Sequence, residues 1–448
     1  MADSKLLKFT DRAQAYPSKR AADERTHDFL EIARPYIVAK AEEQAARCSQ
    51  CGVPFCQVHC PLHNNIPDWL KLTAEGRLEE AYQLSQATNS MPEICGRICP
   101  QDRLCEGSCV IEKDFGSVTI GAGPAGLAAA ELLREQGYAV TVYDRHDRAG
   151  GLLIYGIPGF KLEKEVVERR TQRLADGGVV FKLGFEVGKD ATLEDLRNRH
   201  DAVLIAVGVY AARDLVAPGS GNQGVVPALD YLIASNKKTF GDDVPAYDSG
   251  ELNAAGKDVV VVGGGDTAMD CVRTAIRQGA TSVTCLYRRD KANMPGSLRE
   301  VANAEEEGVT FEWLAAPRAV MGDATGVTGV RAIRMRLGAP DASGRQSPEE
   351  IDGGDFDRPA QLVVKALGFE PENLPETWSA PDLKVTRWGT VKADVRHQMT
   401  NLDGVFAAGD IVRGASLVVW AIKDGRDAAD AIHRYLTAKV SATLIAAE

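Results

Sequence analysis

The sequence has no long hydrophobic run. No stretch of its 448 residues approaches the roughly 18 consecutive apolar residues that a membrane-spanning helix needs. The first residues, MADSKLLKFTDRAQ, are polar and lack the apolar core of a signal peptide. We therefore expect a cytoplasmic protein with no membrane partner.

Positive charge is also in short supply. The chain has 52 basic and 63 acidic residues, which give a net charge of −11 and a pI near 5.3. Because proteins that bind the phosphate backbone of nucleic acids usually carry excess positive charge, we expect no nucleic-acid partner. With 44% hydrophobic and 26% charged residues, the composition is that of a soluble globular protein. The length allows about two to four domains.

Cysteine is scarce outside one segment. Of ten cysteines, only Cys271 and Cys285 lie outside residues 48–109. We expect these two to be buried small apolar residues, the first in a helix and the second in a strand. In a reducing compartment, dense cysteines at short spacing bind metal more often than they form disulfides. The other eight therefore predict metal sites.

The eight clustered cysteines form two groups with short spacings. The first group is Cys48-x2-Cys51-x4-Cys56-x3-Cys60-Pro61, and the second is Cys95-x3-Cys99-Pro100 followed by Cys105-x3-Cys109. Eight thiolates are enough for two iron–sulfur clusters. In two-cluster ferredoxins the cysteine before proline serves the other cluster, so we assign one cluster to Cys48, Cys51, Cys56 and Cys109 and the other to Cys60, Cys95, Cys99 and Cys105. The spacing leaves open a pair of four-cysteine zinc sites.

The composition and the apolar spacing of the sequence change after the cysteines. Residues 1–112 are charged and carry helix-like apolar spacing, which predicts a helical domain. From Ser117 onward, short β-branched runs alternate with glycine turns and helical stretches, which predicts parallel α/β layers. We expect connections at about residues 219–256 and 347–359. We also expect residues 305–307, three consecutive glutamates, to be the solvated face of a helix.

A first dinucleotide site is predicted around residues 117–144. Gly121, Gly123 and Gly126 follow a strand-like run and allow a tight turn, with a phosphate held at the start of the next helix. The following strand ends at Asp144, where a carboxylate would hold a ribose hydroxyl. A simple turn residue is the alternative for Asp144. Asp410, after the strand-like run at 404–409, could contact the cofactor as well.

A second site is predicted about 140 residues further on, where Gly263, Gly265 and Ala268 repeat the glycine-turn pattern. The strand after this turn ends in Arg288 and Arg289 instead of an acid. A guanidinium group pairs with a 2′-phosphate where a carboxylate would repel it, so the sequence favours NADPH over NADH. A solvated arginine pair is the alternative.

Taken together, these motifs resemble a known family. GAGPAG at 121–126, GGGDTA at 263–268 and GVFAAGD at 404–410 resemble the flavin reductases that have two dinucleotide-binding domains. The stretches CPLHNNIPDWL at 60–70, GGLLIYGIPGFK at 150–161 and GASLVVWAI at 414–422 narrow the resemblance to the small (beta) subunits of bacterial NADPH-dependent glutamate synthases. The resemblance covers essentially the whole chain.

The resemblance implies an α/β fold with two Rossmann-like domains after a helical iron–sulfur domain. The implied domains are 1–112 for iron–sulfur, 113–213 and 371–448 for a discontinuous FAD-binding domain, and 214–370 for NADPH. The residues implied to line FAD are Gly121, Gly123, Gly126, Asp144, Gly151, Leu152, Gly409 and Asp410. Those implied to line NADPH are Gly263, Gly265, Asp266, Thr267, Ala268, Arg288 and Arg289.

The activity implied by the resemblance is electron input. NADPH would reduce FAD by hydride transfer, and two [4Fe-4S] clusters would carry the electrons to a large (alpha) subunit. That subunit would carry FMN and glutaminase activity and form L-glutamate from 2-oxoglutarate and L-glutamine, so we expect a hetero-oligomer. No catalytic acid or base is needed, because the cofactors carry the chemistry. An NAD(P)H:ferredoxin or other acceptor oxidoreductase of the same architecture is the alternative.

One feature departs from the family pattern. Only eight residues separate Cys109 from Val118, whereas the family has a connection of a few tens of residues there. The shortened connection does not include the glycines of the first turn.

Overall fold

The computed structural model describes residue 12 and residues 14–48, 50–51, 54–101, 104–105, 122–323, 325–341, 346–394 and 396–445. The predicted strand at 117–120, Gly121 and Cys109 lie outside these residues.

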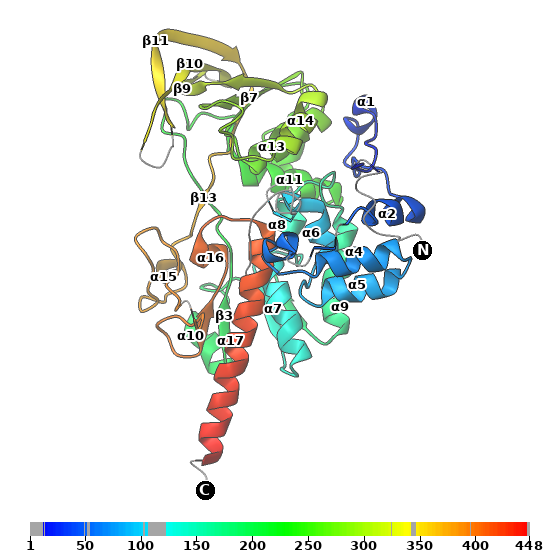
Figure 1. Cartoon of the computed structure of the whole chain (residues 1–448). Helices are drawn as coiled ribbons and strands as arrows, with labels where there is room; N and C mark the ends of the chain where they lie inside the picture. The colour runs from blue at the N-terminus through cyan, green and yellow to red at the C-terminus, as the bar shows by residue number, and fades with distance from the viewer. Residues whose placement is uncertain are drawn as a thin grey trace.

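The N-terminal part is built from short helices, as its apolar spacing predicts. They are α1 (Ala22–Arg25), α2 (Val38–Ala45), α3 (Phe55–Val58), α4 (Ile66–Ala74), α5 (Leu78–Gln86) and α6 (Pro92–Ile98). Helix α4 packs against α2 and α5, and small buried alanines allow the close approach of α2 and α4. In Figure 1, α2, α4 and α5 lie to the right of the rest of the chain and α1 lies near α14, whereas α6 contacts α9 and α17. We call the part of the chain that holds these six helices the N-terminal module.

The next part combines two distant stretches of the chain. The first stretch contains α7 (Pro124–Glu135), β1 (Thr141–Asp144), α8 (Leu152–Tyr155), α9 (Lys164–Asp176), β2 (Val180–Leu183), α10 (Leu193–Arg199) and β3 (Val203–Ile205). The second contains α15 (Leu374–Thr377), β14 (Val405–Ala407), α16 (Asp410–Arg413) and α17 (Val418–Ile445). Strand β3 pairs in parallel with β14, β1 pairs in parallel with β2, and the long helix α17 packs along α7. Because the sequence predicts FAD here, we call this unit the flavin part.

The residues between these stretches form a second layered unit. Its five parallel strands have the order β5-β12-β6-β7-β8. They are β5 (Val225–Pro227), β6 (Asp258–Val262), β7 (Ser282–Tyr287), β8 (Thr310–Trp313) and β12 (Leu362–Lys365). One face is covered by helices, which are α11 (Ala228–Thr239), α13 (Asp266–Arg277) and α14 (Leu298–Glu306), with the short α12 (Pro245–Asp248) beside α11. We call this unit the nicotinamide part.

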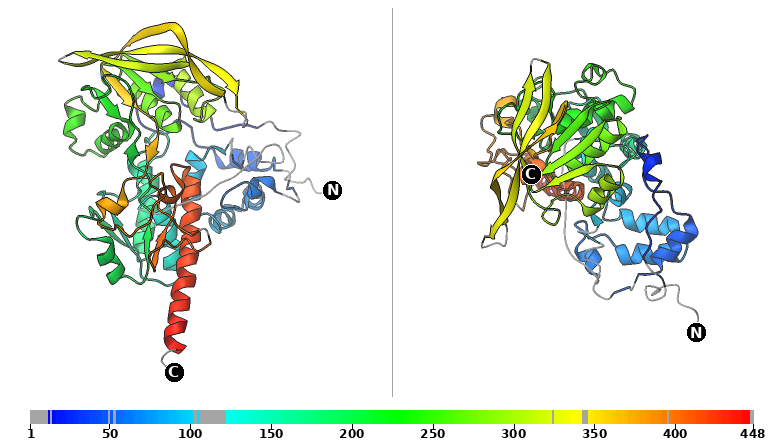
Figure 2. Two further views of the ribbon diagram at one scale, coloured as in Figure 1. Left: turned by 90° about the vertical axis from the view of Figure 1, so that its left-hand side faces the viewer. Right: turned by 90° about the horizontal axis from the view of Figure 1, so that it is seen from above.

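The other face of that sheet is covered by an antiparallel sheet of three strands, which Figure 2 shows at the top of its left view. The strands are β9 (Ala315–Asp323), β10 (Gly326–Pro340) and β11 (Gln346–Pro359). On β6, Val259 and Val261 face the helices while Val260 and Val262 face the antiparallel sheet. Burial on both faces explains the unbroken run of valines.

The two predicted connections are wrong. Residues 219–256 contain α11, whose buried residues at 228, 229, 231 and 232 have helical spacing. Residues 347–359 belong to β11, whose side chains are mostly exposed. Its charged sequence has no apolar face because pairing with β10, rather than burial, holds the strand.

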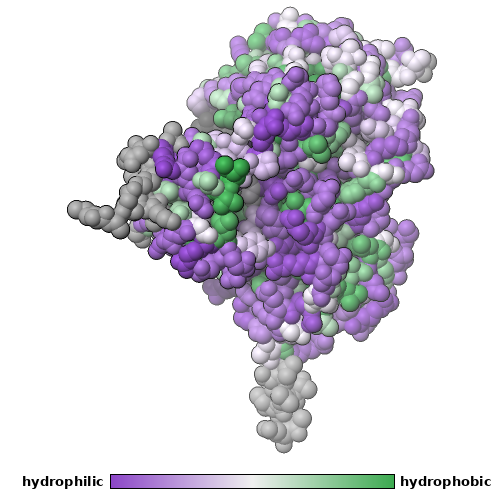
Figure 3. Space-filling model, turned by 90° about the vertical axis from the view of Figure 1, so that its right-hand side faces the viewer, coloured by the Kyte–Doolittle hydropathy of each residue, from purple (hydrophilic) through white to green (hydrophobic). Residues whose placement is uncertain are grey.

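The chain crosses between the flavin and nicotinamide parts twice. Strand β4 (Ala211–Ala212) lies on the outward crossing and pairs antiparallel with β13 (Phe369–Glu370) on the return. In the described residues no helix is long and apolar enough to cross a membrane. The face in Figure 3 is mostly hydrophilic, with small separate hydrophobic patches.

Candidate cofactor and cluster sites

Four cysteine thiols lie near one another in the N-terminal module. Cys60 follows α3, Cys95 lies in α6, and Cys99 and Cys105 follow α6. A hydrogen bond with Cys95, burial and the neighbouring thiols of Cys105 and Cys60 raise the pKa of the Cys99 thiol well above its usual value. This set is the second of the two predicted from the spacing, and its four thiols fit the ligand set of a four-iron cluster.

These thiols also lie next to the flavin part. Cys60, Cys95 and Cys99 pack against an apolar core that contains Leu153 of α8 and Ile422 of α17. The same core takes in residues of α7, so one side of the cysteine set is formed by the flavin part.

The thiols of the first group are placed by the helices around them. Cys48 follows α2 and Cys56 lies in α3. Gln50 holds the loop between them, since its Nε2 donates to Cys48 Sγ at 3.2 Å and to the Pro67 carbonyl at 2.7 Å. None of the described cysteines forms a disulfide. Among the described residues, no group of three or more His, Cys, Asp or Glu side chains could hold a single metal ion in this arrangement.

The glycine turn of the flavin part fits an anionic group. Gly123 precedes α7, whose start has no side-chain cap, and nothing lies within 4 Å of where a Gly123 Cβ would be. Among the described residues, the start of α7 therefore lies beside open space, and an uncapped helix start is a place where a pyrophosphate could bind. Gly151 has φ +53°, and a Cβ there would lie 2.8 Å from Gly123 Cα. Only glycine fits this approach of the two backbones, next to Leu152.

Both predicted aspartates of the flavin part are held in place by hydrogen bonds. Asp144, at the end of β1, accepts hydrogen bonds from the N–H of Ala122 at 3.1 Å and of His146 at 2.8 Å. Asp410 accepts a hydrogen bond from Ser416 Oγ at 2.7 Å, and burial raises the pKa of Asp410. Gly409, with φ +75°, begins the turn before it.

Tyr210 is a site residue that the sequence did not reveal. Its hydroxyl lies 3.7 Å from the Cβ position of Gly151, and the Arg145 guanidinium lies 4.8 Å from its ring centroid. Burial, with a smaller contribution from the charges of Asp144 and Asp410, raises the pKa of Tyr210. Tyr210 thus borders both groups of predicted flavin residues. The one signal in the sequence is the Ala-Val-Gly run at 206–208, which follows β3 and precedes Tyr210.

The second glycine turn fits a phosphate in the same way. Gly263 has φ +147°, and a Cβ there would lie 2.2 Å from the Ala366 carbonyl oxygen. Gly265 precedes α13, whose start has no side-chain cap, and the space beside it is open. Asp266 Oδ1 accepts a hydrogen bond from the Ser297 N–H at 2.9 Å, which folds the 288–297 loop over the turn. The first turn of the helix also contains Thr267 and the fully buried Ala268.

The two predicted arginines differ in their surroundings. Arg288 directly follows β7 and is exposed, whereas Arg289 is half-buried. The Arg289 Nε is buried and, within the described part of the chain, has no hydrogen-bond partner. Because a buried charged donor without a partner is costly, this geometry fits an anion that binds beside β7.

Comparisons with known proteins agree with this architecture. Residues 25–124 match the family described as dihydropyrimidine dehydrogenase domain II, 4Fe-4S cluster, and residues 116–425 match the pyridine nucleotide-disulphide oxidoreductases. The glutamate synthase [NADPH] small chain of Azospirillum brasilense is 64% identical over 483 aligned positions, which cover 100% of both chains. The chain belongs to the family of glutamate synthase small chains. The Escherichia coli small chain is 44% identical over 96% of this chain and 99% of its own length.

Other relatives are named differently. The putative oxidoreductase AegA of Escherichia coli is 45% identical over 95% of this chain and 70% of its own length. Mycobacterium tuberculosis FprA in complex with NADPH has a TM-score of 0.60 at 22% identity, and covers 72% of this chain and 85% of that chain. Lactococcus lactis thioredoxin reductase has a TM-score of 0.52 at 22% identity, and the match covers 72% of this chain and 99% of that chain. These two structures support the fold.

The comparisons confirm several predictions for this chain. It is an oxidoreductase with an iron–sulfur domain before two dinucleotide-binding domains, and the iron–sulfur interpretation replaces the zinc alternative. The iron–sulfur and pyridine nucleotide-disulphide oxidoreductase matches support electron transfer from a pyridine nucleotide, and the small chains that it resembles are named for NADPH. The number of clusters and the residues around each cofactor remain predictions. The alignment with the Azospirillum protein has 483 positions, so at least 35 of them have no residue in this chain of 448. This number is similar to the few tens of residues by which the connection after Cys109 is shorter than in the family.

Proposed function

We propose that this chain is the electron-input subunit of a glutamate synthase. It oxidises NADPH and delivers electrons to a large subunit that carries FMN and glutaminase activity and forms L-glutamate from 2-oxoglutarate and L-glutamine. The observation that carries the proposal is the packing of Cys60, Cys95 and Cys99 against the flavin part. An electron carrier on these thiols would lie between the flavin part and the outer surface of the N-terminal module.

The residues of this chain provide binding and orientation. Gly123 and Gly151 form a narrow backbone cradle, with Asp144 and Asp410 at strand ends on its border. In the nicotinamide part, the open start of α13 would take the pyrophosphate and Arg289 the 2′-phosphate. When bound, FAD accepts hydride from NADPH, and two [4Fe-4S] clusters pass electrons on singly.

The two predicted cysteine sets would then have different positions in the electron path. Cys60, Cys95, Cys99 and Cys105 belong to the set beside the flavin part. Cys48, Cys51, Cys56 and Cys109 would form the other set, which serves the large subunit. The domain boundaries that accompany this function are 1–112, 113–213 with 371–448, and 214–370.

A subunit assay tests the proposal. The purified chain should reduce an artificial dye with NADPH under anaerobic conditions and release no glutamate. Adding the large subunit, 2-oxoglutarate and glutamine should produce glutamate at the expense of NADPH. Glutamate formation by the isolated chain, or none with both subunits, would contradict the proposal.

A second candidate rests on the relative named as an oxidoreductase. AegA matches 95% of this chain at 45% identity, similar to the Escherichia coli small chain. The same architecture could therefore donate electrons to ferredoxin or another acceptor. Equal electron transfer to ferredoxin and to the large subunit in the same assay would favour this candidate.

A further inference from the structure

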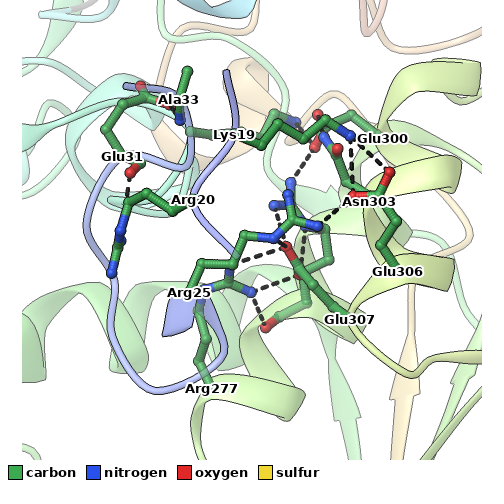
Figure 4. Close-up of polar contacts among 12 residues, drawn as sticks. Lys19, Arg20, Arg25, Glu31, Ala33, Arg277, Glu300, Asn303, Glu306 and Glu307 are labelled. Carbon is green, nitrogen blue, oxygen red and sulfur yellow. Dashed lines mark hydrogen bonds and ion pairs between the residues drawn. The ribbon is translucent and has the colours of Figure 1, made fainter. Parts of the chain in front are cut away.

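A largely buried group of charges, of whose members Glu306 alone is exposed, joins three parts of the chain. We call it the charged junction. Its members are Arg25, Lys161, Asp270, Arg273, Arg277, Glu300, Glu306 and Glu307. Four are basic and four acidic, so the charges balance. Figure 4 shows Arg25 of the N-terminal module and Arg277 of α13 pointing toward Glu307.

The N-terminal module contributes Arg25. This side chain is 1% exposed, donates a hydrogen bond to Glu306 and places its Nε 3.4 Å from Glu307 Oε1. Glu307 also accepts hydrogen bonds from Arg273 at 2.8 Å and Arg277 at 2.8 Å. The prediction that residues 305–307 form a solvated face is therefore wrong for Glu307, which is buried because α14 ends against these arginines.

The flavin part contributes the adjoining residues Phe160 and Lys161. The Phe160 ring is fully buried, with the Arg277 guanidinium 3.9 Å and the Arg273 guanidinium 4.5 Å from its centroid. Lys161 Nζ lies 2.7 Å from Asp270 Oδ1 of α13. Phe29 of the N-terminal module packs on Phe160 at 6.2 Å between ring centroids. All three parts of the molecule thus meet at one point.

The junction bears on the relative orientation of the parts. The chain links the flavin and nicotinamide parts through the short paired strands β4 and β13, a geometry that permits rotation about the pair. Rotation would separate Lys161 from Asp270 and Phe160 from the arginines of α13. A rotated orientation that kept these charges buried would leave them without their partners, which is strongly unfavourable, so the junction favours the orientation in which they are paired.

We propose that Arg25 is a positioning residue for hydride transfer. Through Glu306 and Glu307 it holds the nicotinamide part in one orientation against the flavin part, and so makes that orientation depend on the iron–sulfur module. The proposal rests on the proposed function, because it presumes that NADPH reduces a flavin in this chain. Arg25 itself lies on the module side of the junction and touches neither glycine turn.

The test compares the Arg25→Ala and Arg25→Lys variants with Lys19→Ala as a matched control. Lys19 pairs with the same Glu306 at 2.8 Å but is exposed. Rapid mixing with NADPH separates the dissociation constant of NADPH from the limiting rate of flavin reduction. We expect Arg25→Ala to lower the limiting rate by about tenfold to a hundredfold with an unchanged dissociation constant. Arg25→Lys should recover part of the rate, and Lys19→Ala should match the wild type.

A second readout does not depend on activity. Hydrogen–deuterium exchange of Arg25→Ala should increase at 160–164 and 298–306, on both sides of the junction. Faster exchange confined to residues 16–34, or a weaker NADPH affinity with an unchanged limiting rate, would overturn the proposal. If Arg25→Ala lacks its clusters, Arg25→Lys decides, because a wild-type rate and exchange pattern in that variant would also overturn it. Failure of the wild-type chain to reduce flavin would instead contradict the proposed function.

Discussion

Arg289 should account for most of the preference for NADPH. Its buried Nε has no hydrogen-bond partner among the residues that the structure describes, so it could donate a desolvated, charged hydrogen bond to the 2′-phosphate. Losing such a bond costs about 1.5–3 kcal/mol, or roughly a tenfold to 150-fold fall in kcat/KM. Arg288 is exposed, and an exposed ion pair contributes at most about 1 kcal/mol, or roughly fivefold. The structure therefore predicts unequal effects from two adjacent arginines.

The assay is anaerobic dye reduction with NADPH and with NADH. Arg289→Ala should lower kcat/KM for NADPH by the larger factor and leave that for NADH nearly unchanged, while Arg288→Ala has the smaller effect. Arg318→Ala, at an exposed arginine of β9 paired with Asp355 at 2.8 Å, is the control and should leave both nucleotides unaffected. Equal losses for NADPH and NADH in Arg289→Ala would refute the reasoning, as would a larger effect from Arg288→Ala.

Three further predictions concern the module contact, a buried amine and the flavin cradle. Arg170 is 3% exposed and donates two hydrogen bonds at 2.9 Å to Glu93 of α6. Arg170→Ala should therefore lower the free energy of unfolding by about 3–5 kcal/mol. An unchanged thermal transition temperature would contradict this prediction. Burial lowers the pKa of Lys164 from 10.5 to about 7. Between pH 7 and pH 10.5 the folded chain therefore binds fewer protons than the unfolded chain. The free energy of unfolding should rise with pH in this range, by up to about 1.4 kcal/mol per pH unit. Lys164→Met should lose this rise; the same pH dependence of the thermal transition in variant and wild type would argue against it. Gly151→Ala should lose the absorbance of bound flavin, because its Cβ would lie 2.8 Å from Gly123 Cα. The control Gly241→Ala, at φ +82° in open space, should keep that absorbance. Equal flavin content in the two variants would show that Gly123 and Gly151 do not form the flavin site.

The parts of the fold that local pattern determines could be predicted from the sequence. Glycine turns before helices α7 and α13, the strand end at Asp144 and the helical cysteine module all depend on short-range spacing. The short β-branched runs predicted parallel α/β layers, and the valine run of β6 lies at the centre of the parallel sheet. Cys271 and Cys285 are fully buried, one in α13 and one in β7, as expected.

The features that were missed depend on contacts between distant residues. Glu307 looks solvated in a run of three glutamates, and only the approach of Arg25 and α13 buries it. The Tyr210 hydroxyl lies beside Gly151 in the flavin cradle because of the path of the chain after β3. No spacing of residues in the sequence predicts this path. Strand β11 has no apolar alternation because its order comes from pairing with β10.

The measurement that tests the central claim most directly combines metal analysis with anaerobic stopped-flow absorbance after mixing with NADPH. The account predicts about eight irons and eight acid-labile sulfides per chain, loss of flavin absorbance, and then loss of iron–sulfur absorbance as electrons reach the clusters. Zinc in place of iron would contradict the account. So would reduction of the flavin with no later loss of the iron–sulfur absorbance, because the electrons would then not reach the clusters.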